Sequence, residues 1–299
     1  SAVLVRADLT VVKEVRGACT NQNSIGNERA QANLLQVIAS LFEGTGEQRA
    51  SVAGITLSMA GVDRDAAKAL IRSWVLAAVP IEEACVRVCS DAVAGLASGT
   101  NGVERGVVLI SGTGTIALAM DAPHKPARAQ GWGALFGDVG SGYWIGVEGL
   151  RAHARADDGL GPATAISARL QAYVGEGVDI LEWAYKDGCT DWERFAKLAP
   201  MVLDAHKEGD AVASDILCRA ADGLFESVKC AVSKQPTLAG DFTLVLVGGI
   251  LTHEGSPVAL RLQELMEETF PESQVTLPAL EPHFAAASLA AKAAEARAV

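Results

Sequence analysis

The sequence predicts a two-domain α/β protein with a mixed sheet in each domain, and three observations lead to this fold class. Segments with strand patterns alternate with segments of helical periodicity along most of the chain. Residues Ala2–Gly17 and Ile116–Gly131 share one pattern of strand, acidic turn, strand and glycine, which indicates a duplicated domain. The length of 299 residues also favours two domains. We expect a smaller domain of residues 1–101 with 284–299, and a larger domain of residues 102–283.

The first half of the chain begins with a predicted β-hairpin. Residues 2–16 alternate around a polar turn at Ala7–Asp8. A helix over Asn27–Phe42 follows, with Asn27 as a candidate cap. The next predicted elements are a strand at 53–59, a helix at 65–76, a strand at 86–89 and a helix at 91–98.

The second half follows a polar, hinge-like loop at Gly99–Gly106. A buried strand is predicted at 107–110, and a glycine turn follows at 111–115. The next strand is predicted at 116–120, and a third strand leads through Arg128 to Gly131. The remainder reads as largely helical, with helices at 142–156, 162–174, 178–184, 191–208, 211–233, 257–269 and 283–298, and strands at 242–247 and 274–278.

Composition excludes several classes of function. The net charge of −11, with no run of Lys and Arg, disfavours a nucleic-acid partner. The sequence contains no uninterrupted stretch of about 18 apolar residues, so it predicts no membrane-spanning helix. The six scattered cysteines, without a CxxC motif, are typical of reduced thiols in a cytoplasmic protein. None of the five histidines has metal-site spacing, so we expect no metal site built from protein ligands alone.

The segment Ser111–Thr115 (SGTGT) is a candidate phosphate-binding turn. Gly112 and Gly114 are able to adopt positive φ and expose backbone N–H groups, and Thr113 and Thr115 add hydroxyl donors. An ordinary hairpin turn explains the same residues equally well.

Five glycines lie in Gly131–Gly142 (GWGALFGDVGSG), which is a candidate anion site because the loop leads into a helix. The spacing differs from a dinucleotide fingerprint, which disfavours a nicotinamide dehydrogenase. Trp132 either lines a sugar pocket or fills the interdomain core. Asp138 either binds sugar hydroxyls or caps the helix that follows.

Four further positions allow both a structural and a functional interpretation. Asp91 is either an N-cap, in competition with Ser90, or a general base. The pair Gly248-Gly249 permits close approach of adenine or tight strand–helix packing. His253 is a lone histidine, and Asn21 either forms a turn or binds a sugar hydroxyl.

Seven segments, in order along nearly the whole chain, resemble the N-acetylglucosamine kinase group of the BadF/BadG ATPase-related family. The Gly131–Gly146 segment is the most specific of them. They are TNQNSIG (20–26), SMAGVD (58–63), SDAVAG (90–95), VVLISGTGT (107–115), GWGALFGDVGSGYWIG (131–146), LVGGIL (246–251) and EPHFAAASLAA (281–291).

This resemblance implies an actin-like ATPase (ribonuclease H-like) fold, with two duplicated α/β domains around a cleft that holds ATP and a sugar. It implies that Asp91 is the catalytic base, and it implies Mg²⁺ with the ATP. It assigns sugar contacts to Asn21, Gly131, Trp132, Gly133 and Asp138, a phosphate contact to Thr113, and nucleoside contacts to Gly249 and His253.

The family also has a strand and a D-G-G-G-T-K-like turn ahead of the first hairpin, which handle phosphate and Mg²⁺. We expect that element upstream of Ser1. The function expected is transfer of phosphate from ATP to the 6-hydroxyl of N-acetylglucosamine or glucosamine, by a protein that is a candidate homodimer. The alternatives are an ATPase activator of a dehydratase or reductase, and a sugar-binding sensor without catalysis.

Overall fold

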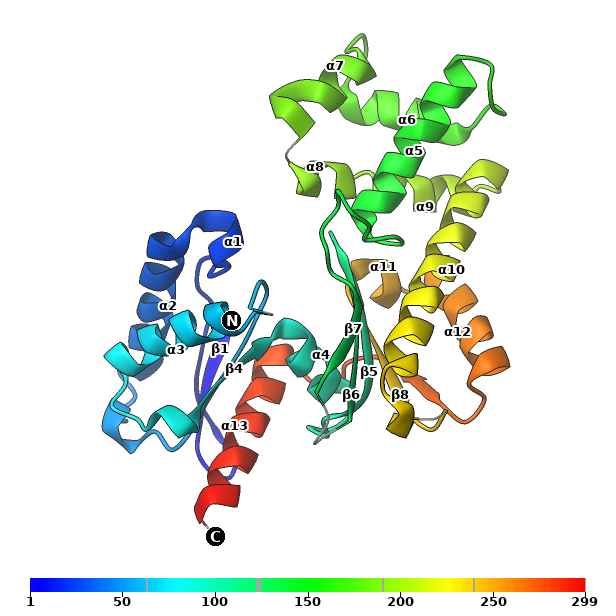
Figure 1. Ribbon diagram of the computed structural model, residues 1–299. Helices are drawn as coiled ribbons and strands as arrows, with labels where there is room; N and C mark the ends of the chain where they lie inside the picture. The colour runs from blue at the N-terminus through cyan, green and yellow to red at the C-terminus, as the bar shows by residue number, and fades with distance from the viewer. Residues whose placement is uncertain (63, 122–124, 190, 239, 299) are drawn as a thin grey trace. The chain divides into compact units, whose positions relative to one another are not determined.

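The computed structural model describes residues 1–62, 64–121, 125–189, 191–238 and 240–298, and it divides into two compact units (Figure 1). The first unit is Ser1–Glu104 with Pro278–Val299, and the second is Arg105–Leu277. The motif residue Asp63 and residues 122–124 of the predicted acidic turn lie outside the described residues.

The first unit has two separate pairs of strands. The predicted hairpin is present, because β1 (Ala2–Val5) pairs antiparallel with β2 (Val11–Val15). β3 (Ile55–Met59) pairs in parallel with β4 (Val86–Ser90). Among the described residues the two pairs share no hydrogen-bonded edge, so they do not form the one mixed sheet predicted for this unit. The helices are α1 (Gln22–Ile25), α2 (Asn27–Phe42), α3 (Asp65–Ala78), α4 (Asp91–Gly99) and α13 (Pro282–Ala298).

α2 forms because its apolar side chains fall on one face. Ala30, Leu34 and Ile38 recur every four residues and are buried in the core of the first unit. The helix begins at Asn27, but its cap is Gly26 with φ of 80°, so the prediction that Asn27 is the cap was wrong. The C-terminal helix α13 packs against α4 and β3 of the same unit.

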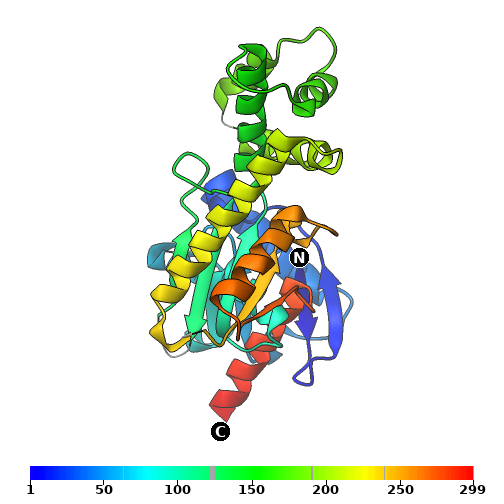
Figure 2. The same cartoon turned by 90° about the vertical axis from the view of Figure 1, so that its right-hand side faces the viewer.

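The second unit contains a five-stranded mixed sheet in the order β7-β6-β5-β8-β9. Its central strand β5 is buried, with Val107, Val108 and Leu109 fully covered. Figure 2 shows α10 (Ala211–Ser233) and α12 (Pro257–Thr269) side by side over this sheet. The strands are β5 (Arg105–Ser111), β6 (Thr115–Asp121), β7 (Ala127–Gln130), β8 (Thr243–Val247) and β9 (Gln274–Thr276).

The other helices of this unit differ from the helices predicted from the sequence in two respects. The helix predicted over 191–208 is broken, because Pro200 lacks the N–H needed for a continuous ladder and starts a new helix. The four-residue helix α11 (Gly249–Thr252) was missed, as was α1 in the first unit, because both are too short to show periodicity. The remaining helices are α5 (Gly142–Asp157), α6 (Ala165–Val174), α7 (Ile180–Tyr185), α8 (Trp192–Ala196) and α9 (Ala199–Lys207).

Two contacts hold the predicted hinge-like loop to the first unit. Arg87 and Glu104 form a two-pronged ion pair, with one N–H···O distance of 2.8 Å. The Lys292 ammonium donates to the carbonyls of Asn101 and Gly102 at 3.3 and 3.0 Å. The segment up to Glu104 is therefore a bonded part of the first unit.

Candidate functional site

Asp91 is the first residue of α4, directly after the buried strand β4. The N-cap is Ser90, whose hydroxyl accepts from Ala92 N, so the interpretation of Asp91 as the cap was wrong. The Asp91 carboxylate is exposed, and its Oδ1 accepts from Ser90 Oγ at 3.1 Å and from Ala92 N at 3.0 Å. A carboxylate is favourable here because the helix dipole is positive at this end. Its fixed, exposed position is suited to accepting a proton from a bound hydroxyl.

Asn21 caps α1 and lies against the turn at Gly61. Its Oδ1 accepts from Asn23 N at 3.0 Å, and Asn23 Nδ2 donates to the Gly61 carbonyl at 3.3 Å. Gly61 has φ of 81°, and a Cβ there would lie 2.7 Å from Asn21 Oδ1. Gly61 is therefore required to position the Asn21 amide, a role that no sequence signal indicated.

The SGTGT turn closes the β5–β6 hairpin, with Ser111 paired to Thr115. Gly112 and Gly114 are both outside the positive-φ region, so neither uses the conformational freedom that glycine allows. Gly114 is needed for close approach instead, because a Cβ there would lie 2.6 Å from Asp138 Oδ2. Within the described residues no hydrogen bond uses the N–H of Thr113 or Gly114, and Thr113 is exposed. These donors are suited to an anion.

The carbonyl groups of the same turn hold the start of α5. Gly142 N donates to Gly112 O at 2.7 Å, and Tyr143 N donates to Thr113 O at 3.4 Å. Trp144 N donates to Ser141 Oγ, which is the N-cap. The first amides of α5 are thus occupied, and the expectation of an anion site at this helix start was wrong.

Asp138 is buried beside the turn, with 5% of its surface exposed and φ of 54°. Because Ser141 caps α5, the interpretation of Asp138 as that cap was wrong. Burial raises the pKa of Asp138, while backbone N–H groups of Thr115 and of Gly131–Gly133 act in the opposite direction. Its Oδ1 has no hydrogen-bond partner among the described residues. The structure therefore brings the SGTGT turn, the 131–133 loop and Asp138 together.

Replacing Asp138 by asparagine is expected to change how stability varies with pH. The pKa of the Asp138 carboxyl is raised in the folded protein above its ordinary value of 3.8. The folded protein therefore binds the carboxyl proton more tightly than the unfolded chain does. The protonated carboxyl therefore stabilises the fold below pH 3.8, and this contribution is lost as pH rises through the folded-state pKa.

Urea unfolding of both proteins across the acidic range measures this difference. Wild type should lose stability relative to D138N as pH rises, and the two curves should then run parallel. A difference that is the same at every pH contradicts the raised pKa.

Trp132 projects from the loop between β7 and α5. It is 68% exposed, and the Arg128 guanidinium lies 4.9 Å from its ring centroid. Leu135 and Phe136 are exposed in the same loop. Trp132 is therefore not packed into the core of its own unit, and its ring presents an apolar face that is suited to a sugar.

Gly248 ends β8 and contacts the SGTGT turn. Its φ is 97°, and a Cβ there would lie 2.2 Å from the Ser111 carbonyl oxygen. Gly249 is the first residue of α11 and His253 is its C-cap, and a Cβ on Gly249 would meet nothing within 4 Å. Gly248 thus supports the turn, while Gly249 leaves open space for a ligand.

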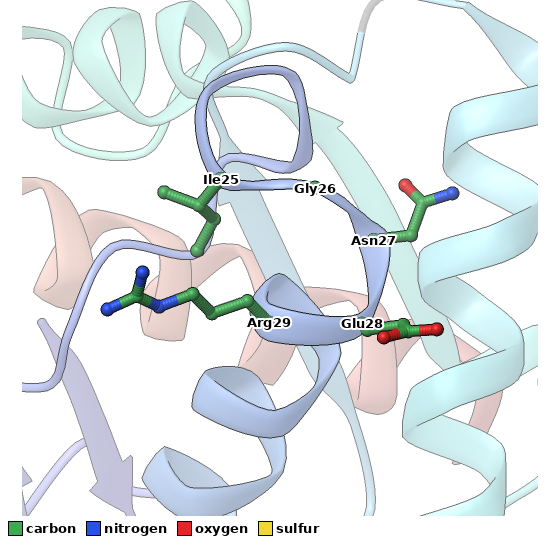
Figure 3. A pocket seen from close by; sticks show the side chains of 5 residues that line it. All are labelled: Ile25, Gly26, Asn27, Glu28 and Arg29. Carbon is green, nitrogen blue, oxygen red and sulfur yellow. The ribbon is translucent and has the colours of Figure 1, made fainter.

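A pocket of about 510 Å³ lies at the junction of α1 and α2 (Figure 3). It is lined by Ile25, Gly26, Asn27, Glu28 and Arg29. In Figure 3 the side chains of Ile25 and Arg29 lie on one side, and those of Asn27 and Glu28 on the other. None of the predicted site residues lines this pocket.

Several kinds of site were not found in the described part of the chain. No group of three or more His, Cys, Asp or Glu side chains is arranged to hold a metal ion. Within the same ranges, no helix is long and apolar enough to cross a membrane. Free thiols among the side chains that the structure describes are Cys19, Cys85, Cys89, Cys218 and Cys230.

Comparison with known sequences gives two curated relatives. The chain is 32% identical over 282 residues to the N-acetyl-D-glucosamine kinase of Dictyostelium discoideum, covering 91% of this chain and 88% of that one. It is 30% identical over 248 residues to the N-acetylmuramic acid/N-acetylglucosamine kinase of Clostridium acetobutylicum, covering 82% of this chain and 80% of that one.

Comparison with solved structures shows the fold. A candidate N-acetylglucosamine kinase from Chromobacterium violaceum superposes with a TM-score of 0.68 at 20% identity, over 94% of this chain and 92% of that one. The ROK hexokinase of Thermus thermophilus gives a TM-score of 0.54 at 13% identity, over 97% and 93%. The predicted actin-like sugar-kinase fold is confirmed. Residues 1–290 match the family predicted from the motifs, and the chain belongs to the BadF/BadG/BcrA/BcrD ATPase family.

Proposed function

We propose that this protein is an ATP-dependent kinase that phosphorylates the 6-hydroxyl of an amino sugar. The observation that carries the proposal is the exposed Asp91 carboxylate at the start of α4. It occurs in a chain whose curated relatives are named N-acetylglucosamine kinases over more than four-fifths of its length. We place the reaction in the cytoplasm, where ATP is available.

In the proposed reaction Asp91 orients the sugar 6-hydroxyl and accepts its proton. The bond between O6 and the γ-phosphorus forms, the bond from that phosphorus to the bridging oxygen breaks, and ADP leaves. The transition state of phosphoryl transfer is loose, so positioning and charge stabilisation contribute more than proton abstraction.

The nucleotide would be held by the SGTGT turn and the start of α11. The N–H groups of Thr113 and Gly114 and the Thr113 hydroxyl would donate to phosphate oxygens. Gly249 and His253 would contact the nucleoside. Magnesium would enter as the Mg–ATP substrate, held largely by phosphate oxygens and water.

The sugar would be held by Asn21, the Gly131–Gly133 loop and Asp138. The unpaired Asp138 Oδ1 supports this, because a buried acceptor without a donor costs free energy that a sugar hydroxyl would recover. Trp132 would pack against the apolar face of the ring.

ATP consumption across a panel of sugars tests the proposal. The full-length gene product is assayed with N-acetylglucosamine, glucosamine, N-acetylmuramic acid and glucose, and we expect ATP consumption to depend on an amino sugar. N-acetylmuramic acid is included because the Clostridium relative is named for it. ATP hydrolysis that no sugar stimulates would contradict a kinase and favour the ATPase activator. Sugar binding without ATP consumption would favour the sensor.

A further inference from the structure

Ser58 lies at the C-terminal end of β3 and contacts the first turn of α4. Its hydroxyl donates to the Ser90 carbonyl at 2.7 Å and accepts from Ala94 N at 3.2 Å. Ser90 is the N-cap of α4, and Ala94 is the residue whose N–H normally bonds to the N-cap carbonyl. Ser58 is therefore bonded to both of the groups that make the first hydrogen bond of an α-helix.

The Ser58 hydroxyl ties the first turn of α4 to the neighbouring strand. It accepts the Ala94 N–H and donates to the Ser90 carbonyl, so a side chain of β3 is bonded to both ends of this turn. A side chain bonded into the i to i−4 ladder influences the direction of the turn. The first turn of α4 is thus shaped by β3.

The turn to which Ser58 is bonded is the one that carries Asp91. Asp91 lies between Ser90 and Ala92, and its Oδ1 is bonded to both of these residues. The pairing of β3 with β4 places Ser58 opposite Cys89, and the Cys89 thiol donates to the Leu57 carbonyl at 3.6 Å. The position of the Asp91 carboxylate therefore depends on a hydroxyl from the neighbouring strand.

We infer that Ser58 is a positioning residue for phosphoryl transfer, because its hydroxyl sets the direction of the Asp91 carboxylate. This inference rests on the proposed role of Asp91 as the general base. Removal of the hydroxyl leaves the other bonds of α4 in place, so the helix remains folded while its first turn is released from β3 and Asp91 moves.

The first part of the test compares Ser58→Ala with Ser58→Thr and Ser98→Ala. Ser98 is the matched control, because it is fully buried in the same helix and its hydroxyl donates to Gly95 O at 2.7 Å. S58A should lower kcat about tenfold, with KM for ATP unchanged, since small displacements of a catalytic group cost that much or more. S58T keeps the hydroxyl and should restore kcat, and S98A should retain the wild-type value.

The second part places S58A in an Asp91→Asn background at high enzyme concentration. A residue that acts only through Asp91 should have no further effect once that carboxylate is absent. An equal loss of kcat in both backgrounds, or full activity of S58A where D91N is impaired, overturns the inference alone. Full activity of D91N overturns the proposed function, and this inference with it.

Discussion

Replacing Asp91 by asparagine is expected to lower kcat about a thousandfold, which is within the range for loss of a general acid or base. Asparagine keeps the shape of the side chain and an oxygen that accepts hydrogen bonds, so α4 should remain intact. It cannot take the proton of the sugar hydroxyl, and it does not attract that hydroxyl with a negative charge. Sugar binding, measured by calorimetry, should therefore change much less than kcat.

Asp65→Asn is the matched control for this experiment. Asp65 is the first residue of α3, as Asp91 is the first residue of α4, and it also lies in the first unit. Its side chain is almost fully exposed, and its ion pair within the described residues is one of 3.7 Å with Lys68. D65N removes the same charge at the same helical position and should leave kcat unchanged. A D91N protein that binds the sugar and keeps near-normal kcat would exclude Asp91 as the base.

Replacing Gly248 by alanine is expected to damage both stability and ATP binding. The residue has φ of 97°, and its Cβ would overlap the Ser111 carbonyl oxygen at 2.2 Å. The strained backbone and the overlap together should cost about 3 kcal/mol of unfolding free energy. Relief of the overlap moves the start of the SGTGT turn, so KM for ATP should rise in the protein that remains folded.

Gly240→Ala separates the two causes of that loss. Gly240 has nearly the same φ, 96°, but a Cβ there would meet nothing within 4 Å. It should therefore lose only about 1 kcal/mol, from backbone strain, and keep the wild-type KM for ATP. Equal losses in the two variants, measured by urea unfolding, would show that contact with the SGTGT turn is unimportant.

The long helices occur where the sequence predicts them, because periodicity and end signals agree there. The predicted bounds of α2, α10 and α12 are those of the structure. Asp210 and Ser256 cap the last two of these helices through their side chains, as expected for these residue types. Local chemistry therefore determines these elements, and the sequence alone was sufficient.

The break between α8 and α9 was also present in the sequence. Pro200 lies eight residues before the end of the predicted helix, and proline favours a first turn over a helix interior. The apolar periodicity continues across the break, which is why the segment was interpreted as one helix. The prediction of one helix was wrong because Pro200 interrupts the hydrogen-bond ladder even where the apolar periodicity continues.

The site residues were predictable by type, whereas their contacts were not. The SGTGT glycines suggested positive φ, but Gly114 is required by the approach of Asp138 from a segment 24 residues away. The roles of Gly61 and Ser58 depend on contacts with Asn21 and α4 that no spacing along the chain reveals. Such contacts are set by strand register and loop conformation, which are properties of the folded chain.

Identification of the product tests the central proposal most directly. The full-length gene product is incubated with Mg–ATP and N-acetylglucosamine, and the sugar is then analysed by phosphorus–proton correlation NMR. We expect one phosphorylated sugar, with the phosphorus coupled to the two protons on carbon 6, formed in step with ADP. Phosphate attached at another position, or ADP formed with inorganic phosphate and an unmodified sugar, would contradict the proposed function.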